Sequence, residues 1–162
     1  MEININRTMP DMSSGLVTGI DRQSKLAIRS LLEEIFMAKI VFCEDEVNIQ
    51  KLVRVMLRSS KHELYIASDG MEGLEMIERV HPDLIFTDIS MPGRDGYQLA
   101  DELKAQKDLA NIPIIFISAF AQRSMMNESY RHGGASYLTK PFSAADLFEK
   151  ISLFCNTEAT QP

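Results

Sequence analysis

The sequence predicts an α/β fold built on a parallel sheet with helices on both faces. Between residues 38 and 154, short apolar runs alternate five times with segments whose apolar residues recur at helical spacing. The runs are continuous rather than alternately apolar and polar, which is typical of strands buried on both faces. Five strands of this kind, each followed by a helix, indicate a doubly wound five-stranded parallel sheet.

Each element has its own signal in the sequence. The predicted strands are Ile40–Cys43, Leu64–Ala67, Leu84–Thr87, Ile112–Ile117 and Ser136–Leu138. The helix-spaced apolar sets that follow them begin at Ile49, Met71, Tyr97, Met125 and Leu147. The run Ile112–Ile117 is the strongest strand signal, with Pro113 near its entry, where a strand tolerates proline.

The chain divides into four segments. They are a polar, mobile segment over residues 1–20, an amphipathic helix over 21–36, a compact domain over 38–154 and a polar tail over 155–162. The helix is predicted because Leu26, Ile28, Leu31, Leu32, Ile35 and Phe36 recur at helical spacing. Asp21 or Ser24 is the predicted cap.

Composition narrows the class of protein. A net charge of -6 over 162 residues argues against electrostatic capture of nucleic acid or of an anionic membrane. No apolar stretch approaches the roughly 20 residues that span a bilayer, and the N-terminus lacks a signal-peptide pattern. The two cysteines, Cys43 and Cys155, have no metal-ligand spacing, so we expect reduced thiols in a cytoplasmic protein.

Polar residues follow four of the predicted strands. Glu44 and Asp45 follow the first strand, Asp88 the third, Ser118 the fourth and Lys140 the fifth. Open α/β sheets bind ligands at the carboxyl ends of their strands, so we expect these side chains to converge. Three close carboxylates repel one another, and a hard divalent cation relieves that repulsion. A lysine and a hydroxyl beside them suit a phosphoryl group, which a carboxylate can accept covalently.

Each of these residues also has a purely structural explanation. Asp88 could be a turn residue before Pro92 and Gly93, and Glu44 and Asp45 could be first-turn helix acids. Ser118 could be a loop hydroxyl and Lys140 a surface charge. The functional interpretation rests on their occurrence together at four strand ends.

Four motifs then give a specific resemblance. They are Cys43-Glu44-Asp45-Glu46, the run Thr87 to Gly96 (TDISMPGRDG), Ile117-Ser118-Ala119, and the run Gly134 to Phe142 (GASYLTKPF). In this order and spacing the chain resembles the receiver domain of bacterial two-component response regulators, of the stand-alone chemotaxis-receiver type. The resemblance implies a flavodoxin-like (βα)5 fold with strand order 2-1-3-4-5, to which the N-terminal helix is an addition.

The resemblance also implies the roles at the phosphoryl group. Asp88 would accept it from a phosphohistidine of a partner histidine kinase or phosphotransfer protein. Lys140 would contact it, together with the backbone at Ile89 and Ala119. Such a protein is a phosphoacceptor, not an enzyme beyond its own phosphorylation and dephosphorylation.

A metal site is implied at the same place. Asp45, Asp88 and the backbone carbonyl of Ser90 would bind Mg²⁺ or Mn²⁺ directly, and Glu44 would act through water. Glu44 lies where aspartate is commoner in the family and still offers a carboxylate.

A conformational switch is implied as well. Ser118, which lies where threonine is commoner, would move toward the phosphoryl group, and Tyr137 would follow it inward. The face formed by the fourth helix, fifth strand and fifth helix of the domain would bind the downstream protein. A cis peptide bond between Lys140 and Pro141 is expected. Phe120, two residues after Ser118, is hypothesised to shield the phosphoryl group from water.

The sequence allows two kinds of output and three roles for the N-terminal helix. Few residues follow Phe154, so we predict a receiver that signals by protein–protein interaction, or one that passes its phosphoryl group on within a phosphorelay. Residues 21–36 could pack on their own receiver, form a homodimer, or be a linker before Met37.

Rival classes fit the sequence less well. A haloacid-dehalogenase-like phosphatase needs a second aspartate where this chain has Ser90. A flavodoxin-like nucleotide binder needs a hydroxyl- or glycine-rich loop where this chain has Glu44, Asp45 and Glu46. A degenerate receiver that only binds partners would lack some of the five expected side chains, and all five are present.

Overall fold

The computed structural model describes residue 19, residues 21–35 and residues 37–155. The predictions of a mobile segment over 1–20 and of a polar tail over 155–162 therefore lie almost wholly outside the described residues. Within the described part of the chain, none of the helices combines the length and the apolar character needed to cross a bilayer.

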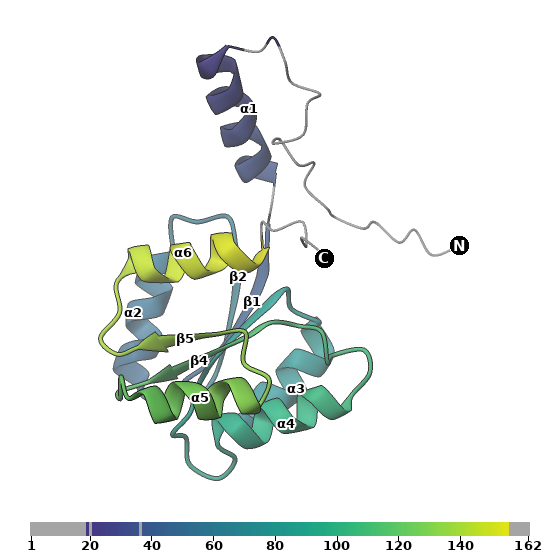
Figure 1. The fold of residues 1–162 in the computed structure, drawn as a ribbon, viewed down its shortest axis with the longest axis vertical. Coiled ribbons are helices and arrows are strands. Elements are labelled where there is room, and N and C mark those ends of the chain that lie inside the picture. Colours follow the sequence, from purple (N-terminus) through teal and green to yellow (C-terminus); the bar gives the residue numbers. More distant parts are fainter. Residues whose placement is uncertain (1–18, 20, 36, 156–162) are drawn as a thin grey trace.

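Five parallel strands form one sheet in the order β2-β1-β3-β4-β5 (Figure 1). The strands are β1 (Lys39–Cys43), β2 (Glu63–Ala67), β3 (Leu84–Asp88), β4 (Ile114–Ser118) and β5 (Ser136–Thr139). This order confirms the predicted fold class. Because β1 lies between β2 and β3, the chain reverses direction across the sheet at the β1–β3 pair.

Helices cover both faces of the sheet (Figure 1). They are α2 (Val47–Leu57), α3 (Gly70–Val80), α4 (Gly96–Ala105), α5 (Arg123–Arg131) and α6 (Ala144–Cys155), and they follow the additional helix α1 (Arg22–Ile35). One core cluster joins the sheet to α3, α4 and α5, and the other joins it to α2 and α6.

Successive residues of one strand serve the two different clusters. Val41 and Cys43 of β1 belong to the cluster under α3 and α4, whereas Ile40 and Phe42 belong to the cluster under α2 and α6. All four are fully buried. Burial on both faces is the physical reason why the strands appear as continuous apolar runs in the sequence.

The predicted start of the fourth strand is wrong by two residues. The strand begins at Ile114, not Ile112, because Ile112 belongs to the preceding turn and donates its N–H to Leu109 O at 3.1 Å. Pro113 has no N–H to give to the sheet. Its carbonyl oxygen still accepts from Ile85 N at 3.0 Å, so the chain enters the sheet through an acceptor alone.

Aspartate caps fix where three helices begin. Asp69 accepts the Glu72 N–H at the start of α3, and Asp95 forms a reciprocal capping box with Gln98 at the start of α4. Asp21 accepts the N–H of Ser24 at 2.9 Å and so begins α1. The cap at Asp95 ends the loop that follows β3, and this loop carries part of the site described next.

Candidate functional site

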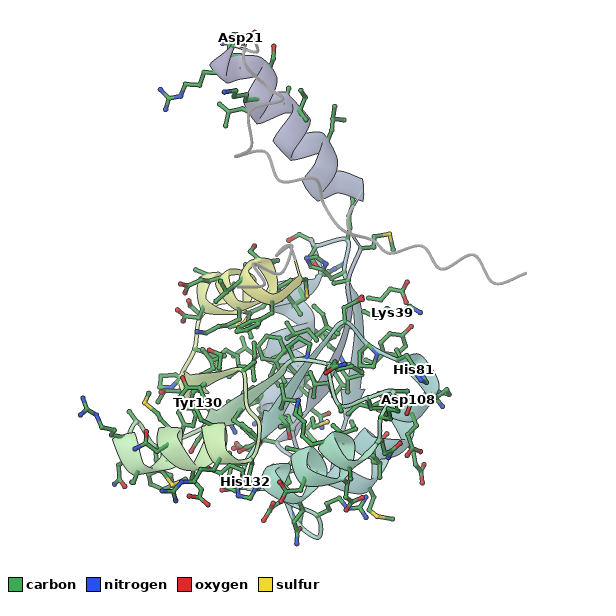
Figure 2. The ribbon with its side chains drawn as sticks, turned by 45° about the vertical axis from the view of Figure 1, so that its right-hand side comes forward. Asp21, Lys39, His81, Asp108, Tyr130 and His132 are labelled. Carbon is green, nitrogen blue, oxygen red and sulfur yellow. The ribbon has the colours of Figure 1, made fainter. Side chains whose placement is uncertain are left out.

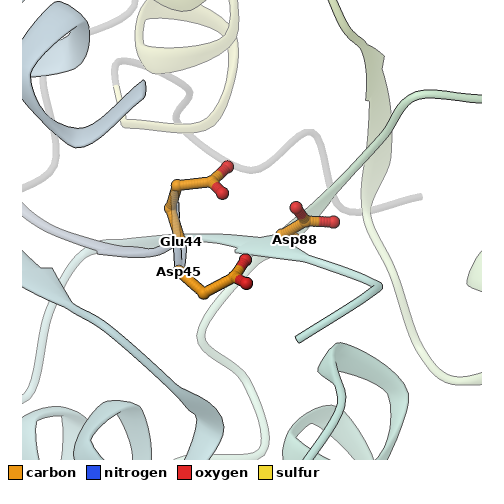
Figure 3. A group of neighbouring side chains, drawn as sticks. All are labelled: Glu44, Asp45 and Asp88. Atoms are coloured by element: carbon orange, nitrogen blue, oxygen red, sulfur yellow. The ribbon is translucent and has the colours of Figure 1, made fainter. Parts of the chain in front are cut away.

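Three carboxylates meet at the carboxyl ends of β1 and β3. Glu44 and Asp45 directly follow β1, and Asp88 is the last residue of β3. Ligand oxygens of all three lie within 4.8 Å of one another (Figure 3). The structure therefore brings these three predicted residues together, and it does so because β1 and β3 are neighbours in the sheet.

Glu44 is the most buried of the three acids. Its side chain is completely inaccessible, and Oε1 accepts the Glu46 N–H at 3.1 Å. Oε2 forms an ion pair with the Lys140 ammonium at 2.9 Å. Burial raises the pKa of the Glu44 carboxyl group, against the opposing effects of Lys140 and the Glu46 N–H.

Lys140 holds the cluster together electrostatically. Its Nζ donates to Asp88 Oδ2 at 2.5 Å, and it lies 2.9 Å from Glu44 Oε2 and 3.6 Å from Glu46 Oε1. Burial lowers the pKa of Lys140, but the bonds and charges of Asp88 and Glu44 outweigh this and the pKa is raised. Lys140 is joined to Pro141 by a cis peptide bond, the isomer that the resemblance implies.

The loop after β3 brings backbone groups to Asp88. The Ser90 N–H donates to Asp88 Oδ1 at 3.0 Å. The Ile89 N–H instead donates to Ile117 O of β4 at 3.0 Å, so in this structure it extends the sheet and does not face the carboxylate. Gly96 closes the loop, and a Cβ there would clash with the Asp88 carbonyl oxygen.

Ser118 and Tyr137 meet through the backbone of Phe120. Ser118, 2% exposed, accepts the Phe120 N–H on its Oγ at 3.1 Å. The Tyr137 hydroxyl donates to Phe120 O at 2.6 Å, and Tyr137 itself is buried. The backbone of Phe120 thus links the two residues that are predicted to form the switch.

Sequence reasoning missed two side chains that support the acids. Glu46 contacts Lys140, and Gln50 of α2 donates from Nε2 to Glu44 O at 2.6 Å. Glu46 adjoins the two predicted acids, so its place in the motif was a usable signal. Gln50 gave none, because its contact depends on how the first turn of α2 packs over the end of β1.

The donor set fits a hard divalent cation. All three side chains offer carboxylate oxygens, the ligands that Mg²⁺ and Mn²⁺ prefer. Lys140 is a single positive charge beside Glu44 and Asp88, so a divalent cation would offset the negative charge that remains on the three acids.

The chain matches a known protein family over most of its length. Residues 40–152 match the family described as the response regulator receiver domain. The chain belongs to this family. It is therefore a receiver domain of two-component signalling, and the matched range contains all the residues of the site.

This receiver is similar in sequence to proteins of several bacteria. It is 39% identical to the transcriptional regulatory protein PdtaR of Mycobacterium tuberculosis over 116 residues, which are 71% of this chain and 55% of PdtaR. It is 32% identical to the chemotaxis protein CheY-3 of Vibrio cholerae over 114 residues, which are 70% of this chain and 88% of CheY-3. The chain spans about half the length of most of the curated relatives it matches.

A solved structure supports the same assignment. The receiver domain of the sensor histidine kinase PA1611 from Pseudomonas aeruginosa has a TM-score of 0.70 and 29% identity to this receiver. The match covers 75% of this chain and all of that one, and that structure contains a magnesium ion in its active-site cleft.

Proposed function

We propose that this receiver accepts a phosphoryl group on Asp88 from a phosphohistidine of a histidine kinase or phosphotransfer protein. The observation that carries the proposal is the environment of Asp88. Its carboxylate is buried, bonded to Lys140 and to the Ser90 N–H, and adjacent to two further acids. An oxygen of Asp88 would bond to phosphorus as the bond from phosphorus to the histidine nitrogen breaks.

Asp45, Asp88 and the Ser90 carbonyl would hold Mg²⁺ or Mn²⁺, with Glu44 acting through water. When bound, the ion would neutralise negative charge on the transferring phosphoryl group and the acids. Lys140, which contacts both Asp88 and Glu44, would supply a second positive charge. The magnesium ion in the PA1611 receiver supports this choice of metal.

Backbone and hydroxyl donors would complete the contacts to the phosphoryl group. The Ser90 N–H already faces the Asp88 carboxylate, and Ala119 and Ser118 follow at the end of β4. The predicted contact from Ile89 is less favoured, because its N–H bonds to β4. If Ser118 moved toward the phosphoryl group, its Oγ would no longer accept the Phe120 N–H. The Phe120 carbonyl, which accepts from the Tyr137 hydroxyl, would then be less constrained.

That coupling would carry the signal to a partner protein. We propose that the face formed by α5, β5 and α6 is the surface that the downstream protein reads, since Tyr137 lies in β5. The proposed setting is cytoplasmic, with no nucleic acid or membrane bound directly, as the net charge of -6 favours.

The alternative output is a phosphorelay. Here Asp88 would pass its phosphoryl group to a histidine phosphotransfer protein. The similarity to a receiver that belongs to a sensor histidine kinase supports this alternative. A donor-loaded sample mixed with a histidine phosphotransfer protein would separate the two, because only a relay receiver loses its label to that protein.

The decisive test is phosphoryl acceptance. The full chain is mixed with acetyl phosphate and Mg²⁺, and the intact mass is measured. We expect one phosphoryl group on the wild type, none on Asp88→Asn, and none when EDTA replaces Mg²⁺. An unmodified wild type, or equal modification of Asp88→Asn, would contradict the proposal.

Phe120 is proposed to set the lifetime of the phosphoryl group. Its backbone is bonded to Ser118 and Tyr137, and the residue is 56% exposed just after the end of β4. We expect Phe120→Glu and Phe120→Asn to shorten the phosphoryl half-life, because a polar side chain can orient an attacking water. An unchanged half-life in both variants would remove the shielding role.

A further inference from the structure

Helix α5 buries little of its surface in the core of the receiver. Ser129 alone among its residues is buried, whereas the neighbouring helix α4 buries Gly96, Leu99, Ala100 and Leu103. A helix with few buried side chains opens more easily than the rest of a fold. Contacts made by single side chains therefore carry more weight in holding α5 in place than they do in α4.

Two side chains link α5 to α4, and the first is Tyr97 of α4. Its ring packs edge-on against Phe116, with 5.1 Å between the ring centroids. Its hydroxyl lies 3.3 Å from the carbonyl oxygen of Met125 and 3.2 Å from Oγ of Ser129, both in α5. Burial raises the pKa of Tyr97 above its ordinary value of 10.0, so this link does not change its charge near neutral pH.

The second link is His132, the residue that follows the last turn of α5. Figure 2 shows it where the end of α5 meets α4. Nδ1 lies 2.8 Å from Oδ1 of Asp101, a residue of α4. Nε2 lies 3.4 Å from Oε1 of Glu128, one turn earlier in α5. Both ring nitrogens thus face carboxylates, and only the protonated ring can donate to both of them.

Two further features favour a positive charge on this ring. His132 is the C-cap residue of α5, where a cation interacts favourably with the helix dipole. The Tyr97 ring is stacked on the imidazole, with 4.5 Å between the centroids, and the face of an aromatic ring attracts a cation. The hydrogen bond with Asp101 raises the pKa of His132, and Glu128 adds to this effect, against a lowering by burial.

Two basic side chains of the same helices are directed to other acceptors. Arg131 Nη1 lies 3.2 Å from Glu128 Oε2, so Glu128 is shared and Asp101 has the larger effect on the ring. The stem of Lys104 lies under Gly133, and its Nζ donates to the Ala110 carbonyl oxygen at 2.7 Å. The groups of α4 and α5 that contact the imidazole are thus the two acids and the tyrosine ring.

We propose that protonated His132 latches α5 onto α4, and that loss of this proton near neutral pH loosens α5. The pKa of His132 is raised above 6.5 in the folded protein. The latch therefore contributes fully below pH 6.5 and is lost as the pH rises through the raised pKa. Since α5 is one side of the surface proposed to bind the downstream protein, that binding should also depend on pH. This last consequence alone rests on the proposed function.

The first test measures the proton on His132 directly. The full chain, in EDTA and without a phosphodonor, is titrated while the imidazole signals are followed by NMR. We expect His132 to titrate with a pKa above 6.5, and Asp101→Asn to lower that pKa because it removes the principal acceptor. The matched control is Asp108→Asn, which removes an acid 3.4 Å from His81 and should leave the pKa of His132 unchanged.

The second test measures how firmly α5 is held. Amide hydrogen exchange is expressed as protection factors, which remove the intrinsic effect of pH on exchange. From about pH 5.5 to about pH 8.5 we expect the protection of α5 to fall at least about threefold relative to α2, which packs on the other face of the sheet. The reference to α2 removes effects of pH on the whole fold, including those from His62 at the amino end of the sheet.

A histidine variant then assigns this change to one residue. His132→Gln should abolish the pH dependence of protection in α5, because an amide does not titrate. The matched control is His81→Asn at the C-cap of α3, which should retain it. Asparagine is chosen there because the backbone is left-handed, with φ of 48°, a conformation that asparagine tolerates.

Three results would overturn the inference. The first is a wild-type His132 that titrates at or below pH 6.5. The second is a protection of α5, relative to α2, that is the same at both pH values. The third is a His132→Gln variant that keeps the pH dependence of the wild type. All these measurements use unphosphorylated protein, so the latch and the phosphoryl acceptance by Asp88 hold or fail separately.

Discussion

The amino and carboxyl ends of the sheet differ in how their polar groups are paired. At the amino end, the backbone N–H groups of Ala38 and Lys39 are satisfied by His62 Nδ1 at 3.2 Å and Asp83 Oδ2 at 2.7 Å. At the carboxyl end, the acids Glu44 and Asp88 are buried around Lys140. The amino end pairs each polar group with one partner, whereas the carboxyl end concentrates charges that share one cation.

The carboxyl end of the sheet therefore buries charged groups that depend on one another for compensation, and the amino end does so much less. Glu44 is buried, and its charge is compensated by the Lys140 ammonium 2.9 Å from Oε2, a cation that it shares with Asp88. Changes at the carboxyl end should therefore alter stability and ligand binding together. Changes at the amino end should alter neither by much.

The largest effect is expected from Lys140→Met. This change removes the cation that lies within 3.6 Å of Glu44, Glu46 and Asp88, so two buried carboxylates lose their counter-charge. We expect a loss of about 3 kcal/mol in the free energy of unfolding by urea at pH 7. The control is Lys39→Met at the amino end, whose side chain is exposed and whose change should stay within about 0.5 kcal/mol.

If Lys140→Met and Lys39→Met lose the same unfolding free energy, the two ends of the sheet do not differ in the way described. A second check is the double variant Lys140→Met with Glu44→Gln. Removing the stranded charge together with the cation should recover part of the stability lost in the single variant, because the two sites are coupled.

The next effect is stabilisation by metal. Binding of Mg²⁺ to the folded protein alone should raise the free energy of unfolding by about 2.7 kcal/mol at a hundredfold excess over Kd. Thermal unfolding with Mg²⁺ and with EDTA measures this. Asp45→Asn should remove most of the gain, whereas Asp83→Asn at the amino end should preserve it. A gain that persists in Asp45→Asn would place the metal elsewhere.

The sequence predicted those parts of the fold and site that depend on local pattern and strand order. Asp88, Glu44 and Asp45 could be found because strand ends are visible as apolar runs that stop, and parallel order brings the ends together. The start of β4 was missed because Ile112 is apolar yet lies in a turn before Pro113. Periodicity does not distinguish a turn residue from a strand residue there.

Contacts made through the backbone were beyond sequence reasoning. The Phe120 carbonyl that accepts from Tyr137 and the Ser90 N–H that faces Asp88 are set by loop conformation, not by residue type. The backbone contact from Ile89 to a phosphoryl group stays a prediction. In this structure the Ile89 N–H extends the sheet toward Ile117 O.

A smaller effect is expected from the tyrosine hydroxyls. Tyr137 and Tyr65 each donate a 2.6 Å hydrogen bond, the first to Phe120 O and the second to Glu63 Oε2 at the amino end. Tyr137→Phe should cost about 1 kcal/mol in unfolding free energy, because it leaves a carbonyl near the site without its donor. Tyr65→Phe should cost less than about 0.5 kcal/mol, because water can reach the Glu63 carboxylate. A larger cost at Tyr65 would reverse the contrast between the two ends.

The last expected effect is a pH dependence that comes from Glu44. Burial raises the pKa of its carboxyl group in the folded protein above the ordinary value of 4.5, so the folded state binds its proton more tightly than the unfolded state. The stabilising contribution is therefore complete below pH 4.5 and is lost as the pH rises through the raised pKa. Lys140 and the Glu46 N–H oppose the shift, which keeps the effect small. Unfolding followed in EDTA over this pH range should show the decline in the wild type, and Glu44→Gln should lack that component because an amide does not titrate. If the two proteins have parallel pH profiles, the Glu44 charge is not penalised by burial, and the carboxyl end is as well satisfied as the amino end.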